Sequence, residues 1–256
     1  MHIKHMIFAL LAGVGLTSMS LPANAAASQL NAAWYTIGFG HQDTEKSADG
    51  LQLGLVESLL GPNGRPVRSA LSAGAAATSS NNIVDINGNS EVLWWTPGTR
   101  AAGTVSVNMN YPSTITLPLG VPANLFPGGV GVGSNGNPAG YLAAHLFGDF
   151  TAPSDGDIVL TLGADDDAWV FINGQLVVDL GGVKGLASAP TTVAGLAPGR
   201  NTIDVFFADR FANQSGLQFS ADVDFTTSPV PEPETYALML AGLAAAGAAA
   251  RRRKAA

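Results

Sequence analysis

The chain has 256 residues, contains no cysteine, and carries 12 basic and 19 acidic side chains. Without cysteine it cannot form thiolate zinc sites, iron–sulfur clusters or disulfides, so core packing, or core packing together with a bound metal, must supply its stability. Five of the twelve basic side chains lie in the terminal segments described below, which leaves about seven against at most 19 acids, a net charge near −12. A domain this acidic is not expected to bind nucleic acid or anionic lipid.

The first 25 residues have the three-part layout of a secretory signal peptide. Lys4 supplies weak positive charge, an apolar run of about 14 residues follows, and Ala23 and Ala25 form a small-residue cleavage box. An apolar run of this length is too short for a comfortable transmembrane anchor. We therefore predict a leader over residues 1–25 that is cleaved after Ala25, and an exported mature chain.

Residues 26–140 are poor in charge and rich in Gly, Ala, Ser and Asn. Short runs of β-branched and aromatic residues between turn residues predict strands, although residues 50–60 could form a short helix. Residues 118–140 hold too many Gly, Pro and Asn for a regular element, and their G-x-G-x-x-G spacing lacks the βαβ context of a dinucleotide site. The predicted strands cover residues 34–39, 83–86, 92–95, 104–109 and 114–117.

Residues 141–226 are more regular and predict successive antiparallel strands. Asn173 and Gly174 separate two of these runs, and this dipeptide favours a two-residue hairpin because both residues accept positive φ. From Leu217 to Phe225 apolar and polar residues alternate strictly, which places one face on a core and the other in water. No helix-period segment intervenes, so we expect an all-β, antiparallel β-sandwich. The other predicted strands cover residues 157–162, 168–172, 175–180, 191–196 and 202–208.

The C-terminal end consists of a Pro-rich linker over residues 227–235 and a hydrophobic segment with a basic terminus over residues 236–256. A helix over the 15 apolar positions would reach about 22 Å, which is shorter than a hydrocarbon core of about 30 Å. The basic residues that follow it would stay on the cytoplasmic side and leave the preceding domain outside.

This order of parts, with Pro231, Glu232 and Pro233 ahead of the apolar run, resembles the PEP-CTERM sorting signal. Such signals are processed by an exosortase in bacteria that make extracellular polysaccharide. The resemblance covers about the last 27 residues and implies removal of the tail near the Pro-Glu-Pro motif. It also implies at least transient membrane contact through the tail, and delivery to the cell surface, outer membrane or extracellular matrix of a Gram-negative-type bacterium. An uncut membrane anchor is the alternative.

Asp165, Asp166 and Asp167 stand together between two predicted strands. Adjacent carboxylates on a tight turn repel one another, and each raises the cost of ionising the next. A bound cation would relieve the repulsion, and hard oxygen ligands suit Ca²⁺. The three residues are therefore candidate metal ligands, with a merely solvated acidic turn as the alternative.

The run over residues 163–182, GADDDAWVFINGQLVVDLGG, resembles the centre of the fibro-slime domain, and the likeness extends from His145 to Phe225. Fibro-slime domains are similar to the protective-antigen-type, jelly-roll-like β-sandwich of yeast flocculins and adhesins. In lectin members of that group a vicinal Asp pair holds Ca²⁺, which binds sugar hydroxyls. The resemblance places this pair at Asp165 and Asp166, with Asn213 as the nearest counterpart of the Asn that completes the shell.

Few residues between the two terminal segments suggest catalysis. His41 and His145 lie far apart in sequence with no recognisable triad, and nothing in the spacing selects a glycosidase pair of carboxylates. Trp169 could stack on a sugar, but its place in an apolar strand favours the core. We therefore expect a non-catalytic protein that binds extracellular polysaccharide through Ca²⁺, or adheres, in an exopolysaccharide or biofilm matrix. A purely structural matrix component and an accessory domain of a polysaccharide hydrolase are the alternatives.

Overall fold

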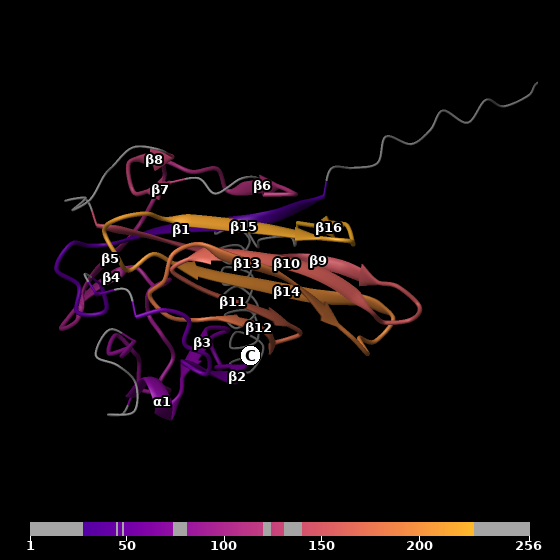
Figure 1. Cartoon of the computed structure of the whole chain (residues 1–256), viewed down its shortest axis with the longest axis horizontal. Coiled ribbons are helices and arrows are strands. Elements are labelled where there is room, and N and C mark those ends of the chain that lie inside the picture. The colour runs from indigo at the N-terminus through magenta and orange to yellow at the C-terminus, as the bar shows by residue number, and fades with distance from the viewer. Residues whose placement is uncertain are drawn as a thin grey trace, which may run out of the picture.

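The computed structural model describes residues 28–44, 46–47, 49–73, 81–119, 124–130 and 140–227. Nearly all regular structure in these residues is β, and the expected antiparallel β-sandwich is confirmed, since every strand pairing among them is antiparallel. Figure 1 shows the long strands running roughly along the longest axis of the molecule. The elements are β1 (Gln29–Ile37), β2 (Val56–Leu60), β3 (Pro66–Arg68), α1 (Ala70–Ala73), β4 (Gly98–Arg100), β5 (Gly103–Val107), β6 (Thr114–Thr116), β7 (Leu125–Phe126), β8 (Gly129–Val130), β9 (Tyr141–Ala152), β10 (Ile158–Asp165), β11 (Asp167–Ile172), β12 (Gln175–Leu180), β13 (Ala187–Val193), β14 (Gly199–Ala208), β15 (Gly216–Ala221) and β16 (Phe225–Thr226).

Two sheets make up the sandwich. The large sheet has the order β3-β2-β12-β11-β14-β9-β1-β5-β4, with β16 and β6 attached to β9 and β1, and the small sheet has the order β13-β10-β15. Strand β1 pairs with β9 from Asn31 opposite Phe147 to Ile37 opposite Tyr141. The two halves of the chain, residues 26–140 and 141–226, therefore build one large sheet together.

The large sheet is covered on both faces, as the alternation along β14 shows. Ile203, Val205 and Phe207 belong to the core between the two sheets, together with residues of β10 and β15. Phe206 and Ala208 point to the other face, where they join a second cluster that contains Trp94, Trp95 and Trp169. Because β11 contributes to both clusters, all six of its residues are buried.

Several strand predictions for the first half are wrong. Residues 50–60 contain no helix and instead lead into β2, while residues 83–86 and 92–95 form no strands and meet at one isolated bridge, between Ile86 and Val92. The N–H groups of Val84 and Asp85 donate to the carboxylate of Asp43, so this backbone is satisfied by a side chain and needs no neighbouring strand.

Other predicted boundaries shift while the elements persist. The hairpin at Asn173 and Gly174 is confirmed, with φ values of 51° and 78°. The strand predicted over residues 191–196 is β13, which begins at Ala187 and ends at Val193. Within the segment expected to lack regular structure, β7 and β8 form a short hairpin.

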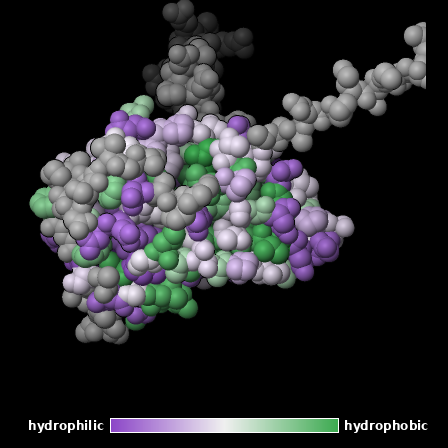
Figure 2. Space-filling view, turned by 45° about the horizontal axis from the view of Figure 1, so that its top comes forward, coloured by the Kyte–Doolittle hydropathy of each residue, from purple (hydrophilic) through white to green (hydrophobic). Residues whose placement is uncertain are grey.

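The predicted leader with Ala23 and Ala25, the G-x-G-x-x-G segment, and the tail with Pro231, Glu232 and Pro233 lie outside the described residues. In the part of the chain that the structure describes, no helix is long and apolar enough to cross a membrane. On the face that Figure 2 shows, hydrophobic residues form separate patches among hydrophilic ones rather than one broad apolar surface.

Substituting Phe219 by Ala tests which face of β15 is buried. The ring of Phe219 is 1% exposed in the core between the sheets, so its removal should cost about 3–5 kcal/mol of unfolding free energy in urea titrations. The neighbouring Ser220→Ala, on the other face of the same strand, should cost no more than about 0.5 kcal/mol. Equal losses for the two variants would contradict the predicted alternation.

Candidate functional site

The three consecutive aspartates lie where the chain passes from one sheet to the other. Strand β10 of the small sheet ends at Asp165, and β11 of the large sheet begins at Asp167. The side chains of Asp165, Asp166 and Asp167 are only 6%, 1% and 0% exposed, and the Asp165–Asp166 peptide bond is cis. The interpretation of an exposed, solvated tight turn is therefore wrong, because the ladder of β10 continues three residues beyond the predicted end at Leu162.

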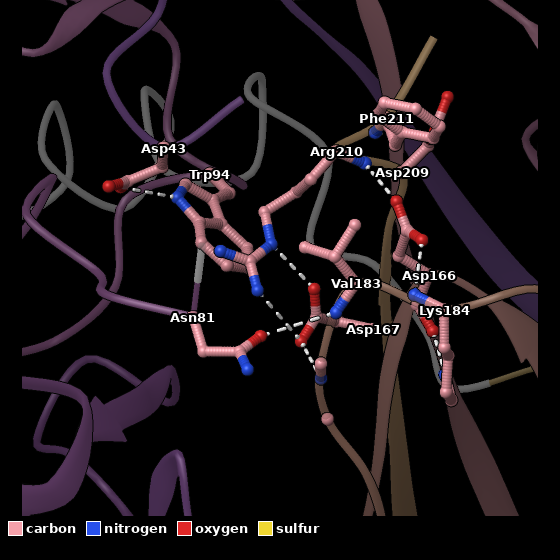
Figure 3. Close-up of polar contacts among 12 residues, drawn as sticks. Asp43, Asn81, Trp94, Asp166, Asp167, Val183, Lys184, Asp209, Arg210 and Phe211 are labelled. Atoms are coloured by element: carbon pink, nitrogen blue, oxygen red, sulfur yellow. Dashed lines mark hydrogen bonds and ion pairs between the residues drawn. The ribbon is translucent and has the colours of Figure 1, made fainter. Parts of the chain in front are cut away.

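Two loops hold the carboxylates of Asp166 and Asp167. Asp166 accepts the main-chain N–H of Lys184 at Oδ1 (2.8 Å) and that of Arg210 at Oδ2 (2.7 Å). Asp167 accepts the N–H of Gly182 at Oδ1 and the Nε–H of Arg210 at Oδ2, both at 2.6 Å. The loop after β12 and the loop after β14 thus converge on the aspartates, as Figure 3 shows.

Three more charged residues join the three consecutive aspartates in a group that we call the aspartate corner: Asp165, Asp166, Asp167, Asp209, Lys184 and Arg210. Asp209 is 1% exposed, and its carboxylate interacts with that of Asp166. The Lys184 ammonium donates to the main-chain carbonyl oxygens of Ala164 (3.2 Å) and Asp166. With every group ionised, four carboxylates face two cations, which leaves a buried net charge of −2.

The pKa values of three of the four aspartates in the corner are raised. Burial, aided by repulsion from Asp167, raises the pKa of Asp166 to about 7. Burial also raises the pKa of Asp165, and it raises that of Asp209 well above its ordinary value, with repulsion from Asp166 adding to the effect. The corner therefore resists full ionisation unless further positive charge is supplied.

A small cavity of about 180 Å³ opens beside the corner, and Asp165, Asp166 and Asn213 all contribute to its wall. The structure thus brings together these three residues that the sequence singled out, whereas the carboxylate of Asp167 is directed at Arg210 and Gly182. The other lining residues are Lys184, Gly185, Phe211 and Gln214.

A larger cavity, of about 580 Å³, lies near the other end of β14 and is lined by Asp149, Arg200 and residues around β16. Of its three charged residues, Asp149 and Arg200 pair with each other at 2.9 Å, and Asp224 is exposed to solvent. We favour the smaller cavity as the functional site because uncompensated buried carboxylates converge there.

The N-terminal half of the chain supports the corner from the second face of the large sheet. The guanidinium of Arg210 lies 5.1 Å from the ring centroid of Trp94, and the indole N–H of Trp94 donates to Asp43 at 2.9 Å. Asn81 accepts the main-chain N–H of Val183, in the loop after β12, at 3.3 Å. Asn81 and Trp94 thus each contact one of the two loops that hold the aspartates, and so help to position them (Figure 3).

The donors around the cavity suit a hard cation. Among the described residues, no group of three or more His, Asp or Glu side chains is arranged as a ready-made metal site. Asp165, Asp166 and Asn213 offer two carboxylates and one amide, and each carboxylate oxygen has more than one acceptor position. This set resembles part of a Ca²⁺ shell, which takes 6–8 oxygens and admits carbonyls and water.

The remaining sequence candidates lie elsewhere. His41 pairs with Asp85 at 3.1 Å, and His145 pairs with Asp204 at 2.8 Å, so each imidazole has its own carboxylate outside the cavity. The predicted core position of Trp169 is confirmed, since its side chain is fully buried. Sequence reasoning missed Lys184, Asp209 and Arg210, although an Asp-Arg pair directly after an apolar strand is a usable signal.

Two protein families match the chain, one within the β-sandwich and one at the C-terminal tail. Residues 114–205 match the PA14 domain, and residues 229–254 match the PEP-CTERM protein-sorting motif. The predicted sorting signal and protective-antigen-type sandwich are thereby confirmed. The narrower fibro-slime assignment stays a prediction.

Curated relatives share only a segment with this chain. Protein psiR of Dictyostelium discoideum is 38% identical over 96 residues, which make up 35% of this chain and 9% of psiR. Protein psiB of the same organism is 41% identical over 70 residues, 26% of this chain and 13% of psiB. The chain therefore spans roughly a tenth of the length of these relatives.

Solved structures with a similar outline include two adhesin domains. The A domain of Epithelial Adhesin 9 from Candida glabrata, solved in complex with Galb1-4GlcNAc, is 14% identical with a TM-score of 0.36, covering 81% of this chain and 89% of that domain. A PA14 sugar-binding domain from an RTX adhesin is 13% identical with a TM-score of 0.32, covering 78% and 91%.

Removing the Arg210 side chain tests the charge balance of the corner. Arg210→Met would leave Asp167 buried without its ion-pair partner, and we expect a loss of about 3–5 kcal/mol in the free energy of unfolding. Arg200→Met removes the same charge from a side chain that is 71% exposed, so that water can replace it beside its partner Asp149, and should cost no more than about 1 kcal/mol. A similar small effect for both variants would show that Asp167 does not depend on Arg210.

The raised pKa of Asp166 predicts how stability depends on pH when EDTA removes divalent cations. Between its ordinary pKa of 3.8 and its folded pKa of about 7, the folded state holds a proton that the unfolded state releases. The free energy of unfolding should therefore fall by on the order of 2–3 kcal/mol from pH 5 to pH 7. Asp85 and Glu91, whose pKa values are lowered, act below this window. Asp165 and Asp209, whose pKa values are also raised, add to the fall in the same direction. Asp166→Asn should therefore reduce the dependence without abolishing it, and an unchanged slope would contradict the assignment.

Proposed function

We propose that this chain, an exported protein that carries a PA14 domain and a PEP-CTERM sorting motif, binds carbohydrate through Ca²⁺ held at Asp165 and Asp166. The observation that carries the proposal is the aspartate corner, where four buried carboxylates face two cations, a net charge of −2 when all are ionised, beside a small cavity. A divalent cation has the charge that balances this excess. Its binding would favour the ionised form of carboxylates that burial otherwise disfavours.

The residues at the cavity suggest how metal and sugar would share the site. Asp165 and Asp166 would hold the ion, and Asn213, on the exposed rim, would complete the protein part of the shell. When bound, Ca²⁺ supplies open coordination positions that accept pairs of sugar hydroxyls. Phe211 and Gln214, on the same wall, offer an apolar surface and an amide that would set selectivity.

We assign Asp167 to positioning rather than to the metal shell. Unlike Asp165 and Asp166, Asp167 does not line the cavity, and its fully buried carboxylate forms an ion pair with Arg210. Through Arg210 it fixes the loop whose main-chain N–H binds Asp166. Asp167 would therefore hold a ligand residue in place without contacting the ion.

The role that we propose is binding rather than catalysis. Glycosidases set two carboxylates across a cleft, about 5 to 10 Å apart, whereas Asp165 and Asp166 are consecutive residues that share one wall of a small cavity. Carbohydrate binding also agrees with the sorting motif. An exosortase-type enzyme would process the tail, and the mature domain would meet extracellular polysaccharide at the cell surface or in a biofilm matrix.

Isothermal titration of Ca²⁺ into the double variant Asp165→Asn, Asp166→Asn tests the site. Wild-type protein should bind one Ca²⁺, and the variant should lose this binding because both ligand carboxylates become neutral amides. The matched control Asp155→Asn, Asp224→Asn removes two charges from exposed acids and should bind Ca²⁺ like wild type. Equal binding by all three proteins would remove the proposed metal site.

A glycan array probed with and without EGTA tests the second half of the proposal. We expect wild-type protein to bind glycans only when Ca²⁺ is present, and the Asp165→Asn, Asp166→Asn variant to bind none. A blank array for a protein that does bind Ca²⁺ would overturn the sugar-binding role. That result would favour the structural matrix component, in which the cation only stiffens the joint between the sheets.

A further inference from the structure

Lys184 occupies an unusual position for a lysine. Its side chain is 6% exposed, although lysine is among the residues least often buried. The ammonium donates to the carbonyl oxygens of Ala164 and Asp166, and the main-chain N–H of the same residue donates to the carboxylate of Asp166. Lys184 thus donates hydrogen bonds to three oxygen atoms, one of Ala164 and two of Asp166.

The oxygens that Lys184 engages are of the kind that a hard cation also seeks. Main-chain carbonyls are ordinary Ca²⁺ ligands, and the two carbonyls here belong to the residues on either side of Asp165. Lys184 also lines the cavity together with Asp165, Asp166 and Asn213. The ammonium therefore lies at the place where we propose that the metal binds.

The charges of the aspartate corner explain why the position of Lys184 matters. Arg210 is committed to Asp167, since both side chains are fully buried and the Nε to Oδ2 distance is 2.6 Å. Lys184 is then the remaining cation of the corner, and its charge interacts with those of Asp167, Asp166 and Asp165. With Lys184 the corner carries −2 when fully ionised, and without it the corner would carry −3.

We infer that Lys184 is a tethered counter-cation of the aspartate corner, which stabilises the corner when Ca²⁺ is absent and lowers its affinity for Ca²⁺ when the ion is offered. The second part rests on the proposed function, because it assumes that the metal binds at Asp165 and Asp166. The ammonium of Lys184 balances part of the carboxylate charge when Ca²⁺ is absent. When Ca²⁺ binds in the same cavity, the two positive charges repel each other.

Removing the ammonium should consequently have two effects of opposite sign. The Ca²⁺-free protein should become less stable, because three buried carboxylates lose a compensating charge. The affinity for Ca²⁺ should rise, because a competing positive charge has gone. A lysine with a merely structural role would not produce this pair, since its loss would loosen the site and weaken Ca²⁺ binding as well.

Lys184→Met keeps the aliphatic length of the side chain and removes its charge. In EDTA at pH 7 we expect the melting temperature to fall by about 5 °C or more, and in calorimetric titrations we expect the Kd for Ca²⁺ to fall by about tenfold or more. Arg200→Met is the matched control, because it removes one positive charge near the other end of β14 from Arg210. It should leave the Kd for Ca²⁺ unchanged and lower the melting temperature by much less than Lys184→Met.

The outcomes separate the inference from the proposed function. A lower melting temperature with unchanged or weaker Ca²⁺ binding would reduce Lys184 to a structural residue and overturn the inference, while wild-type Ca²⁺ binding would leave the proposed function intact. If wild-type protein binds no Ca²⁺, the proposed function fails, and the competition between lysine and metal fails with it.

Lysine acetylation of the wild-type protein provides a second measurement if Lys184→Met does not fold. Between the predicted leader and tail the chain has two lysines, Lys46 and Lys184, so Lys46 is an internal control. Mass spectrometry should show that saturating Ca²⁺ raises the acetylation rate of Lys184 severalfold and leaves that of Lys46 unchanged. An unchanged rate for Lys184 at a Ca²⁺ concentration that saturates the protein would overturn the inference.

Discussion

Buried negative charge at the joint between the two sheets is the constraint on which the rest of this structure depends. The chain crosses from β10 to β11 through three aspartates, and a fourth, Asp209, arrives from the loop after β14. Such charges are costly in a protein interior unless they are paired or neutralised. Arg210 and Lys184 supply part of the compensation, and we propose that a divalent cation in the cavity beside the joint supplies the remainder.

The N-terminal half of the chain has a definable role in this arrangement. Strand β1 extends the large sheet beside β9, while the segment with Trp94 and Trp95 covers its outer face. Trp94 lies against Arg210 and is itself held by Asp43, so the half that carries no ligand candidate fixes the orientation of the half that does. A binding site built on packed strands with supporting hydrogen bonds loses little freedom when it binds its ligand.

Local patterns were enough to predict the sandwich and the position of the corner along the chain. Alternation from Leu217 to Phe225, the Asn-Gly turn and the Asp165-Asp166 pair are all short-range signals. The burial of the corner was not predictable, because its partners Lys184 and Arg210 come from loops 18 and 44 residues beyond Asp166. Residues 83–86 looked like a strand for a related reason, since the sequence does not show that Asp43, about 40 residues away, satisfies their backbone.

The most direct test of the account is a crystal structure of the mature domain grown with millimolar Ca²⁺, with anomalous data collected at a long wavelength. We expect one anomalous peak in the cavity beside Asp165, Asp166 and Asn213, with oxygen ligands at about 2.3–2.6 Å. Density for water alone between these side chains would contradict it, because the excess charge of the joint would then be resolved by protonation and not by a metal.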